Sequence, residues 1–376
     1  MKDILQRVNL YLLSAILLTI VLYFGKTVIV PIMFAALLAM LMAPICRWLD
    51  AKGVNRVISC LTCVFILLIT LLIVLGVTVG EIVMFAQDLP QIEKKAGELF
   101  KNLQAFVEDS INVSAEKQDA FVQKQIQNLG KSAGQYISKI LGGLTTTIAG
   151  LLITLVFTFL FLYNKERYET FFLKLYKEEE TSKVKGIVQQ ISTVSQKYLT
   201  GRAMSILILF GLYSIGLLII GIKNAVLLAG VAALLTVVPY VGSTIGGIFP
   251  FLMALVTEDS VQPAFWVVAV IVFIQAMDNY FIEPNVVGGE VNLSALASII
   301  VIICGGLIWG VSGMVLFIPM LAIIKIVCDH VEPLKPYGYI LGDPDGNAPS
   351  RIREWIKEKF SKRTSSRTKR SKSKAV

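Results

Sequence analysis

The 376-residue chain has few charged residues and a single histidine, and both shortages exclude classes of protein. Charged residues make up 16% of the sequence, against about 25% in a typical soluble domain, while hydrophobic residues make up 55%. Mean hydropathy is +0.72. This composition excludes an ordinary water-soluble domain, so we expect an all-α protein that crosses a membrane several times.

The sequence also lacks the usual parts of an enzyme or a metalloprotein. It contains no Gly-x-x-x-x-Gly-Lys-Ser/Thr loop for a nucleotide, and His330 stands far from other residues at metal-ligand spacing. The five cysteines form one C-x-x-C, Cys60 and Cys63, without a second pair. We therefore predict no enzymatic activity, no cofactor, no metal site and no disulfide framework.

The net charge of +9 is concentrated in the last residues of the chain. Residues 351–374 hold eleven Lys or Arg and two Glu, which leaves 24 basic and 24 acidic residues elsewhere. A basic run just beyond a membrane span is typical of the cytoplasmic side, where it contacts anionic lipid. No nucleic-acid recognition motif accompanies it, so we predict no binding to RNA or DNA.

Eight hydrophobic segments follow one another along the chain. Basic residues between the second and third segments, and between the fourth and fifth, place those loops and the N-terminus in the cytoplasm, and the basic tail places the C-terminus there too. Six segments have the length of one membrane span: 10–24, 28–45, 58–79, 140–163, 203–222 and 265–282.

Residues 81–139 are predicted to form an amphipathic helical region outside the membrane. Apolar residues recur at helical spacing from Phe100 to Ile111, and Ser114 and Gly130 are plausible caps of a second helix. The apolar stripes need cover from the membrane surface, from each other or from a neighbouring subunit, which favours a homo-oligomer.

The two remaining segments, 225–255 and 297–327, are apolar but interrupted in the middle. As a straight helix each would be about 46 Å long, against about 30 Å of hydrocarbon, and each half is too short to span. We predict two re-entrant helical hairpins, although two long kinked crossings are the alternative. The interruptions contain one proline and several glycines: Pro239, Gly242, Gly246, Gly305, Gly306, Gly310 and Gly313.

Polar side chains interrupt the segment between the hairpins. Gln275, Asp278, Asn279 and Glu283 fall within an arc of about 140° on one helical face. A carboxylate inside a membrane segment indicates a functional site by default. The alternative is that Asp278, about one turn from the helix end set by Pro284, simply reaches headgroup water.

These groups suit a binding site for a small polar solute, or for Na⁺ or H⁺. In a proton-coupled transporter one group must exchange a proton for the cargo, and Asp278 is the first candidate and Glu283 the second. Hydroxyl groups at the hairpin interruptions either complete this site or satisfy local backbone groups in turns: Tyr240, Ser243, Thr244 and Ser312.

Several motifs occur in a fixed order up to about residue 330. They are Tyr198-Leu-Thr-Gly201, the run PYVGSTIGGIFP at 239–250, Gln275 with Asp278-Asn279 and Glu283-Pro284, Val287-Gly288, and Gly310-Val-Ser-Gly313 before Pro319. This order resembles the autoinducer-2 exporter family of bacterial membrane permeases. The chain departs from the family pattern at Arg202, where Gln is frequent, and at Ser243, where Pro is frequent.

The resemblance implies a multi-pass protein of the bacterial inner membrane that exports a small polar molecule such as autoinducer-2 by alternating access. Sodium(lithium)/proton antiport is the alternative it implies, and a passive oligomeric channel is a third reading. It also suggests a homo-oligomer, with a pentamer as one option. We divide the chain into 1–80 (three spans), 81–139 (outer helices), 140–202 (fourth span and a cytoplasmic amphipathic helix), 203–330 (transport core) and 331–376 (tail).

Overall fold

The computed structural model describes residues 2–111, 134–135, 138–139, 141–174, 181–238, 241–257, 261–287 and 292–343. Within these ranges the secondary structure is helical and contains no strand. Six helices are long and apolar enough to cross a membrane, which confirms an all-α polytopic membrane protein. They are α2 (Lys26–Ala51), the first part of α3 (Arg56–Ile111), α5 (Leu144–Tyr163), α7 (Thr181–Ile220), α10 (Gln262–Met277) with the π-helix η2 (Asp278–Val287), and α12 (Val311–His330).

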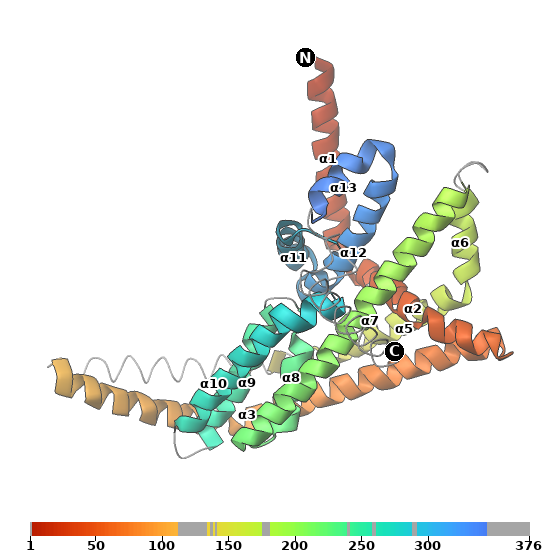
Figure 1. Cartoon of the computed structure of the whole chain (residues 1–376). Helices are drawn as coiled ribbons and strands as arrows, with labels where there is room; N and C mark the ends of the chain where they lie inside the picture. The colour runs from red at the N-terminus through yellow and green to blue at the C-terminus, as the bar shows by residue number, and fades with distance from the viewer. Residues whose placement is uncertain are drawn as a thin grey trace, which may run out of the picture.

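The other described helices are shorter or lie at the edges of the bundle (Figure 1). The first predicted span lies in α1 (Lys2–Phe24), which projects away from the body and exposes its large apolar side chains. The Trp309 Nε1 donates a hydrogen bond of 2.8 Å to the Leu22 carbonyl at the end of α1. The remaining helices are α6 (Lys165–Lys174), α8 (Ala225–Leu235), α9 (Val241–Thr257), α11 (Ala295–Trp309), the 3₁₀ turn η3 (Glu332–Leu334) and α13 (Lys335–Leu341).

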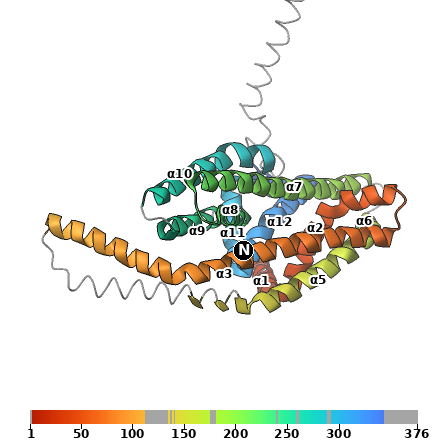
Figure 2. The same ribbon diagram turned by 90° about the horizontal axis from the view of Figure 1, so that it is seen from below.

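Helix α3 is the longest element, with 56 residues, or about 84 Å at 1.5 Å per residue. Its second half extends beyond the other helices as an arm (Figures 1 and 2). The helix continues without a break across residue 80, so the membrane span and the start of the predicted outer region form one continuous helix. The second predicted outer helix, between Ser114 and Gly130, lies outside the described residues.

Both interrupted segments fold back as antiparallel helical hairpins, which agrees with the predicted fold-back, and their re-entry into the membrane stays a prediction. In the first hairpin, made by α8 and α9, Gly242 approaches the Leu235 carbonyl and Gly246 approaches the backbone of Ala232. The connection runs through residues 236–240, of which Pro239 and Tyr240 lie outside the described part of the chain. The absence of a Cβ at these two glycines lets the two backbones touch.

The second hairpin, made by α11 and α12, turns at Gly310. This residue has φ 62° and ψ −141°, a conformation that is essentially restricted to glycine. Gly305 and Gly313 lie inside the two helices, where their backbones meet face to face, and Gly306 contacts Met314. The prediction that each half is too short to span is wrong for α12, because its 20 residues reach span length.

The first hairpin lies between two layers of helices. Figure 2 shows α7 and α10 on one side of α8 and α9, with α3 on the other. The largest apolar core fills the α7 side and includes Leu209, Leu217, Leu228 and Val267. A smaller core joins α2, α3 and α5 and contains the buried Cys46, Cys60 and Cys63. All five cysteines are free thiols.

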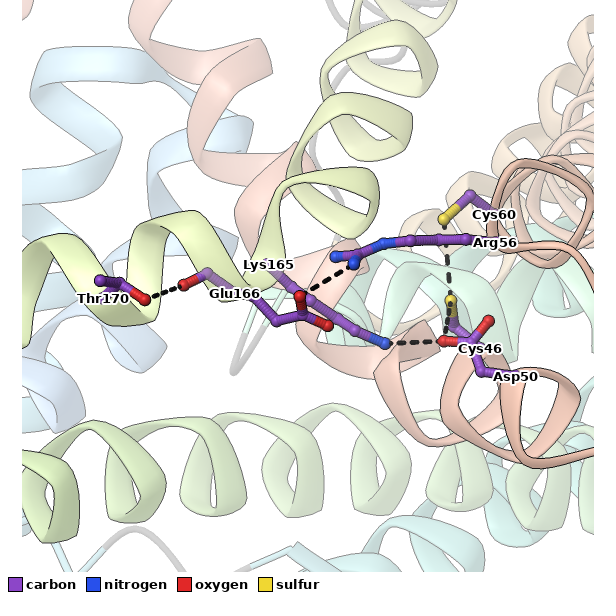
Figure 3. A network of polar contacts seen from close by, with 7 residues as sticks. All are labelled: Cys46, Asp50, Arg56, Cys60, Lys165, Glu166 and Thr170. Atoms are coloured by element: carbon purple, nitrogen blue, oxygen red, sulfur yellow. Dashed lines mark hydrogen bonds and ion pairs between the residues drawn. The ribbon is translucent and has the colours of Figure 1, made fainter.

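A polar network joins the α2–α3 turn to the start of α6 (Figure 3). The Lys165 Nζ lies 3.0 Å from the Asp50 Oδ2, and the Arg56 guanidinium lies 3.0 Å from the Glu166 carboxylate. The Cys46 and Cys60 Sγ atoms lie 3.7 Å apart, next to Asp50 and Arg56 (Figure 3). Two ion pairs therefore hold the start of α6 against the α2–α3 turn.

We expect the Asp50–Lys165 pair to stabilise the fold modestly. Its two side chains are 27% and 29% exposed, so solvent screening limits a coupling free energy to about 1 kcal/mol. A double-mutant cycle with Asp50→Ala and Lys165→Ala, measured by unfolding in detergent micelles, checks this. The exposed Lys335–Glu332 pair is the control and should show no coupling. Strictly additive losses for Asp50 and Lys165 would contradict the prediction.

Candidate transport site

Asp278 is the first residue of η2, directly after α10. The residue is only 5% exposed, and its Oδ1 atom has no hydrogen-bond partner among the described residues. Ile274 and Ile282, four residues before and after it, are also buried and pack in the core shared with α7. Asp278 therefore faces α7 inside the bundle. Short π-helical segments in membrane-length helices frequently occur at functional sites.

The facing surface of α7 is a buried stripe at intervals of four residues. It consists of Gly201, Ser205, Leu209, Tyr213 and Leu217. The Ser205 hydroxyl lies within hydrogen-bonding reach of the Asp278 carboxyl. The charged side chains of Arg202 and Glu283 interact electrostatically with the same carboxyl. Asp278 also interacts electrostatically with the Tyr213 hydroxyl, which lies two turns from Ser205 along the same stripe.

Two polar atoms at this place are buried and lack hydrogen bonds within the described part of the chain. They are the Asp278 Oδ1 and the Arg202 Nε, and beside them the Ser205 hydroxyl has the Asp278 carboxyl as a neighbouring polar group. Buried polar atoms in folded proteins nearly always have a partner, and each exception needs a physical reason. The Asp278 Oδ1 is an acceptor, so it is suited to hold a proton, a small cation or water, whereas the Arg202 Nε can only donate.

Along α7, the site lies between the residues that contact the first hairpin and the residues that contact the second. Leu199 packs in the apolar cluster of the second hairpin, with Trp309 and Leu316. Ile206 and Leu209 pack in the core of the first hairpin. Arg202 and Ser205 occupy the interval between these contacts. A rearrangement of either hairpin against α7 would therefore change the surroundings of Asp278.

The structure gathers only part of the predicted site around Asp278. Glu283 is half-buried and interacts electrostatically with Asp278. Gln275, one helical turn before Asp278, is also half-buried. Asn279 is exposed. At the hairpins, Ser243 and Ser312 are half-buried, Thr244 is exposed, and Tyr240 lies outside the described residues. The predicted polar face is thus divided between the bundle interior and its surface.

Sequence reasoning did not select Ser205, Tyr213 or Arg202 as site residues. Arg202 stood out only as a departure from the family pattern, and Ser205 and Tyr213 lie in an ordinary apolar span. The available signal was the spacing of four residues that places Ser205 and Tyr213 in line with Gly201. That spacing identifies a helix face but not the element that the face contacts.

A cavity of about 400 Å³ lies elsewhere, between α7 and α10. Its lining is mostly apolar and includes Gly216, Ile220, Trp266 and Val270. It does not border Asp278, so we assign it no part in binding a polar cargo.

Comparison with known proteins gives the family. A model described as AI-2E family transporter matches residues 12–332. YueF of Bacillus subtilis, named as a candidate transport protein, is 26% identical over 313 residues, covering 80% of this chain and 84% of YueF. YhhT of Escherichia coli, named likewise, is 22% identical over 349 residues, covering 92% of this chain and 97% of YhhT.

A third relative has a more specific name. A protein of Halobacillus andaensis named sodium-lithium/proton antiporter is 24% identical over 327 residues, covering 83% of this chain and 92% of that protein. The family match extends over nearly the whole described bundle, including both hairpins and the helix that carries Asp278. The chain therefore belongs to the AI-2E family of transporters.

Proposed function

We propose that the protein is a secondary transporter that exchanges protons for sodium or lithium ions at Asp278. The observation that carries this proposal is the buried, unsatisfied carboxyl of Asp278 between the two hairpins. A site this enclosed fits a proton or a small cation better than a molecule with many hydroxyl groups. The named activity of the Halobacillus andaensis relative supports the same choice of ions.

Asp278 is suited to exchange because its carboxyl is enclosed by Ile274, Ile282 and α7 and keeps one oxygen atom without a hydrogen-bond partner among the described residues. A carboxyl group can hold either a proton or a cation at the same oxygen atoms, so the two can replace one another. Movement of a hairpin against α7 would expose the site to one side of the membrane at a time.

The second candidate function is export of a small polar molecule such as autoinducer-2. The half-buried Gln275 and Ser312 favour it, because amide and hydroxyl groups can bind a polar solute. We further propose a homo-oligomer in a bacterial inner membrane with both termini in the cytoplasm, since the exposed apolar helices need lipid or neighbouring subunits as cover.

Proteoliposomes with an internal pH-sensitive dye test the proposal. We expect Na⁺ or Li⁺ to dissipate a preset pH gradient with saturable kinetics, and K⁺ to leave it unchanged. A gradient that is insensitive to Na⁺ and Li⁺ would contradict antiport. In that case, saturable uptake of labelled autoinducer-2 would support the second candidate, and a flux linear in solute concentration would indicate a channel.

Replacing Arg202 by glutamine is expected to strengthen sodium binding at the site. Loss of the positive charge removes a repulsion on a cation held at Asp278, so the half-saturating sodium concentration should fall by up to about tenfold. Dye-monitored exchange at several sodium concentrations measures the effect, and Arg202→Lys, which keeps the charge, should behave like the wild type. An Arg202→Gln variant with an unchanged sodium dependence would contradict the prediction.

A further inference from the structure

A second carboxyl group is buried in the bundle, away from Asp278. Glu81 lies in α3 and is 5% exposed, and its Oε2 atom has no hydrogen-bond partner in the described part of the chain. The exchange at Asp278 described above does not use it. Glu81 is thus a buried ionisable group without an assigned role.

The neighbours of Glu81 on α3 show what it faces. Val77 and Phe85 lie four residues before and after it, so the three side chains share one helix face. Val77 approaches Gly230 of α8, and Phe85 packs edge to face on Phe249 of α9, with ring centroids 5.2 Å apart. Glu81 therefore faces the seam between the two helices of the first hairpin.

Within the described residues, the two hairpin helices that Glu81 faces offer no counter-charge. Helices α8 and α9 contain no ionisable side chain over residues 225–235 and 241–257. The charged group that acts on Glu81 is Asp88, two turns further along α3, and it has the same sign. A buried carboxylate without a cation is strongly disfavoured, so the group must bind a proton where the hairpin covers it.

We propose that Glu81 is a second proton-binding site, on the opposite side of the first hairpin from α7 and Asp278. With the hairpin packed on α3, the acid is neutral. When the hairpin moves away, water reaches the carboxyl and the proton leaves. The inference deepens the proposed function, because hairpin movement would then release a second proton, but proton binding at Glu81 can be measured without transport.

Infrared difference spectroscopy of the full-length protein in liposomes tests the site directly. Spectra recorded at acidic and alkaline pH isolate the carbonyl stretching band of carboxylic acids that lose their proton. We expect Glu81→Gln to lose the contribution of one buried acid relative to the wild type. Asp88→Asn and Asp278→Asn should each retain the Glu81 contribution. A Glu81→Gln spectrum identical to that of the wild type would overturn the proposal, and so would a Glu81 band that persists at alkaline pH.

Two further measurements separate this proposal from the antiport proposal. Glu81→Asp keeps an acid on a shorter side chain and should shift the frequency of the carbonyl band. This variant keeps the proposal testable if Glu81→Gln fails to fold. In proteoliposomes that exchange sodium, Glu81→Gln should lower the number of protons moved per sodium ion by about one; an unchanged ratio would overturn the coupled role. If no sodium exchange occurs but the band depends on Glu81, the antiport proposal fails and the proton site stands.

Discussion

Replacing Asp278 by asparagine is expected to reduce sodium-dependent proton movement at least about a hundredfold, the lower end of what a positioned proton-transfer group contributes. Asparagine has nearly the same shape and can fill the same buried position between Ile274 and Ile282. It cannot bind and release a proton, and it presents no negative charge to a cation. The loss should therefore appear in transport and not in folding. Dye-monitored exchange in proteoliposomes measures the rate, and unfolding in detergent measures the stability.

The controls for Asp278→Asn separate chemistry from packing. Asp278→Glu keeps the carboxylate but displaces it, so it should retain partial activity with an altered dependence on sodium concentration. Asp329→Asn removes a half-exposed carboxylate at the end of α12, paired with Lys325, and should exchange ions at the wild-type rate. Wild-type exchange in Asp278→Asn would remove Asp278 from the mechanism and favour a channel that needs no titrating group.

Replacing Gly313 by alanine is expected to destabilise the protein by about 3 kcal/mol or more. A Cβ at this position would overlap the backbone carbonyl of Gly305, which belongs to a regular helix and has little freedom to yield. Relief requires α11 and α12 to separate along their seam, and this loses the packing of Trp309 on Phe317 as well. Unfolding in detergent micelles, followed by the loss of helical circular dichroism, measures the change.

The matched control is the same substitution at Gly76. A Cβ there would meet no atom within 4 Å, and the residue lies in the middle of α3. Alanine has the higher helix propensity by about 1 kcal/mol, so Gly76→Ala should be neutral or slightly stabilising. Equal stabilities of Gly313→Ala and Gly76→Ala would show that the two hairpin helices do not need to touch.

The sequence by itself determined the class of the protein and most of its elements. Long apolar runs predict helices in a membrane because each backbone group must bond within its own helix there. Glycines and a proline in the middle of two such runs predicted two hairpins, since these residues act on the local backbone. Asp278 was recognisable because a charged residue in an apolar segment stands out in the sequence alone, without knowledge of the residues that contact it.

Only the tertiary structure decided which groups share a site. Ser205 and Arg202 lie far from Asp278 in the sequence, and they meet it because α7 and η2 pack face to face. Glu81 stood at the start of a predicted outer region, yet α3 continues through it and places it against the first hairpin.

The glycines show the same division between local and tertiary information. Composition marked all of them as interruptions, but Gly310 forms the turn while Gly305 and Gly313 provide the contact between helices. Helical periodicity tells which side chains share a face, whereas the identity of the opposing face depends on how whole helices fit together. That fit is a property of the folded bundle and is absent from any local stretch of sequence.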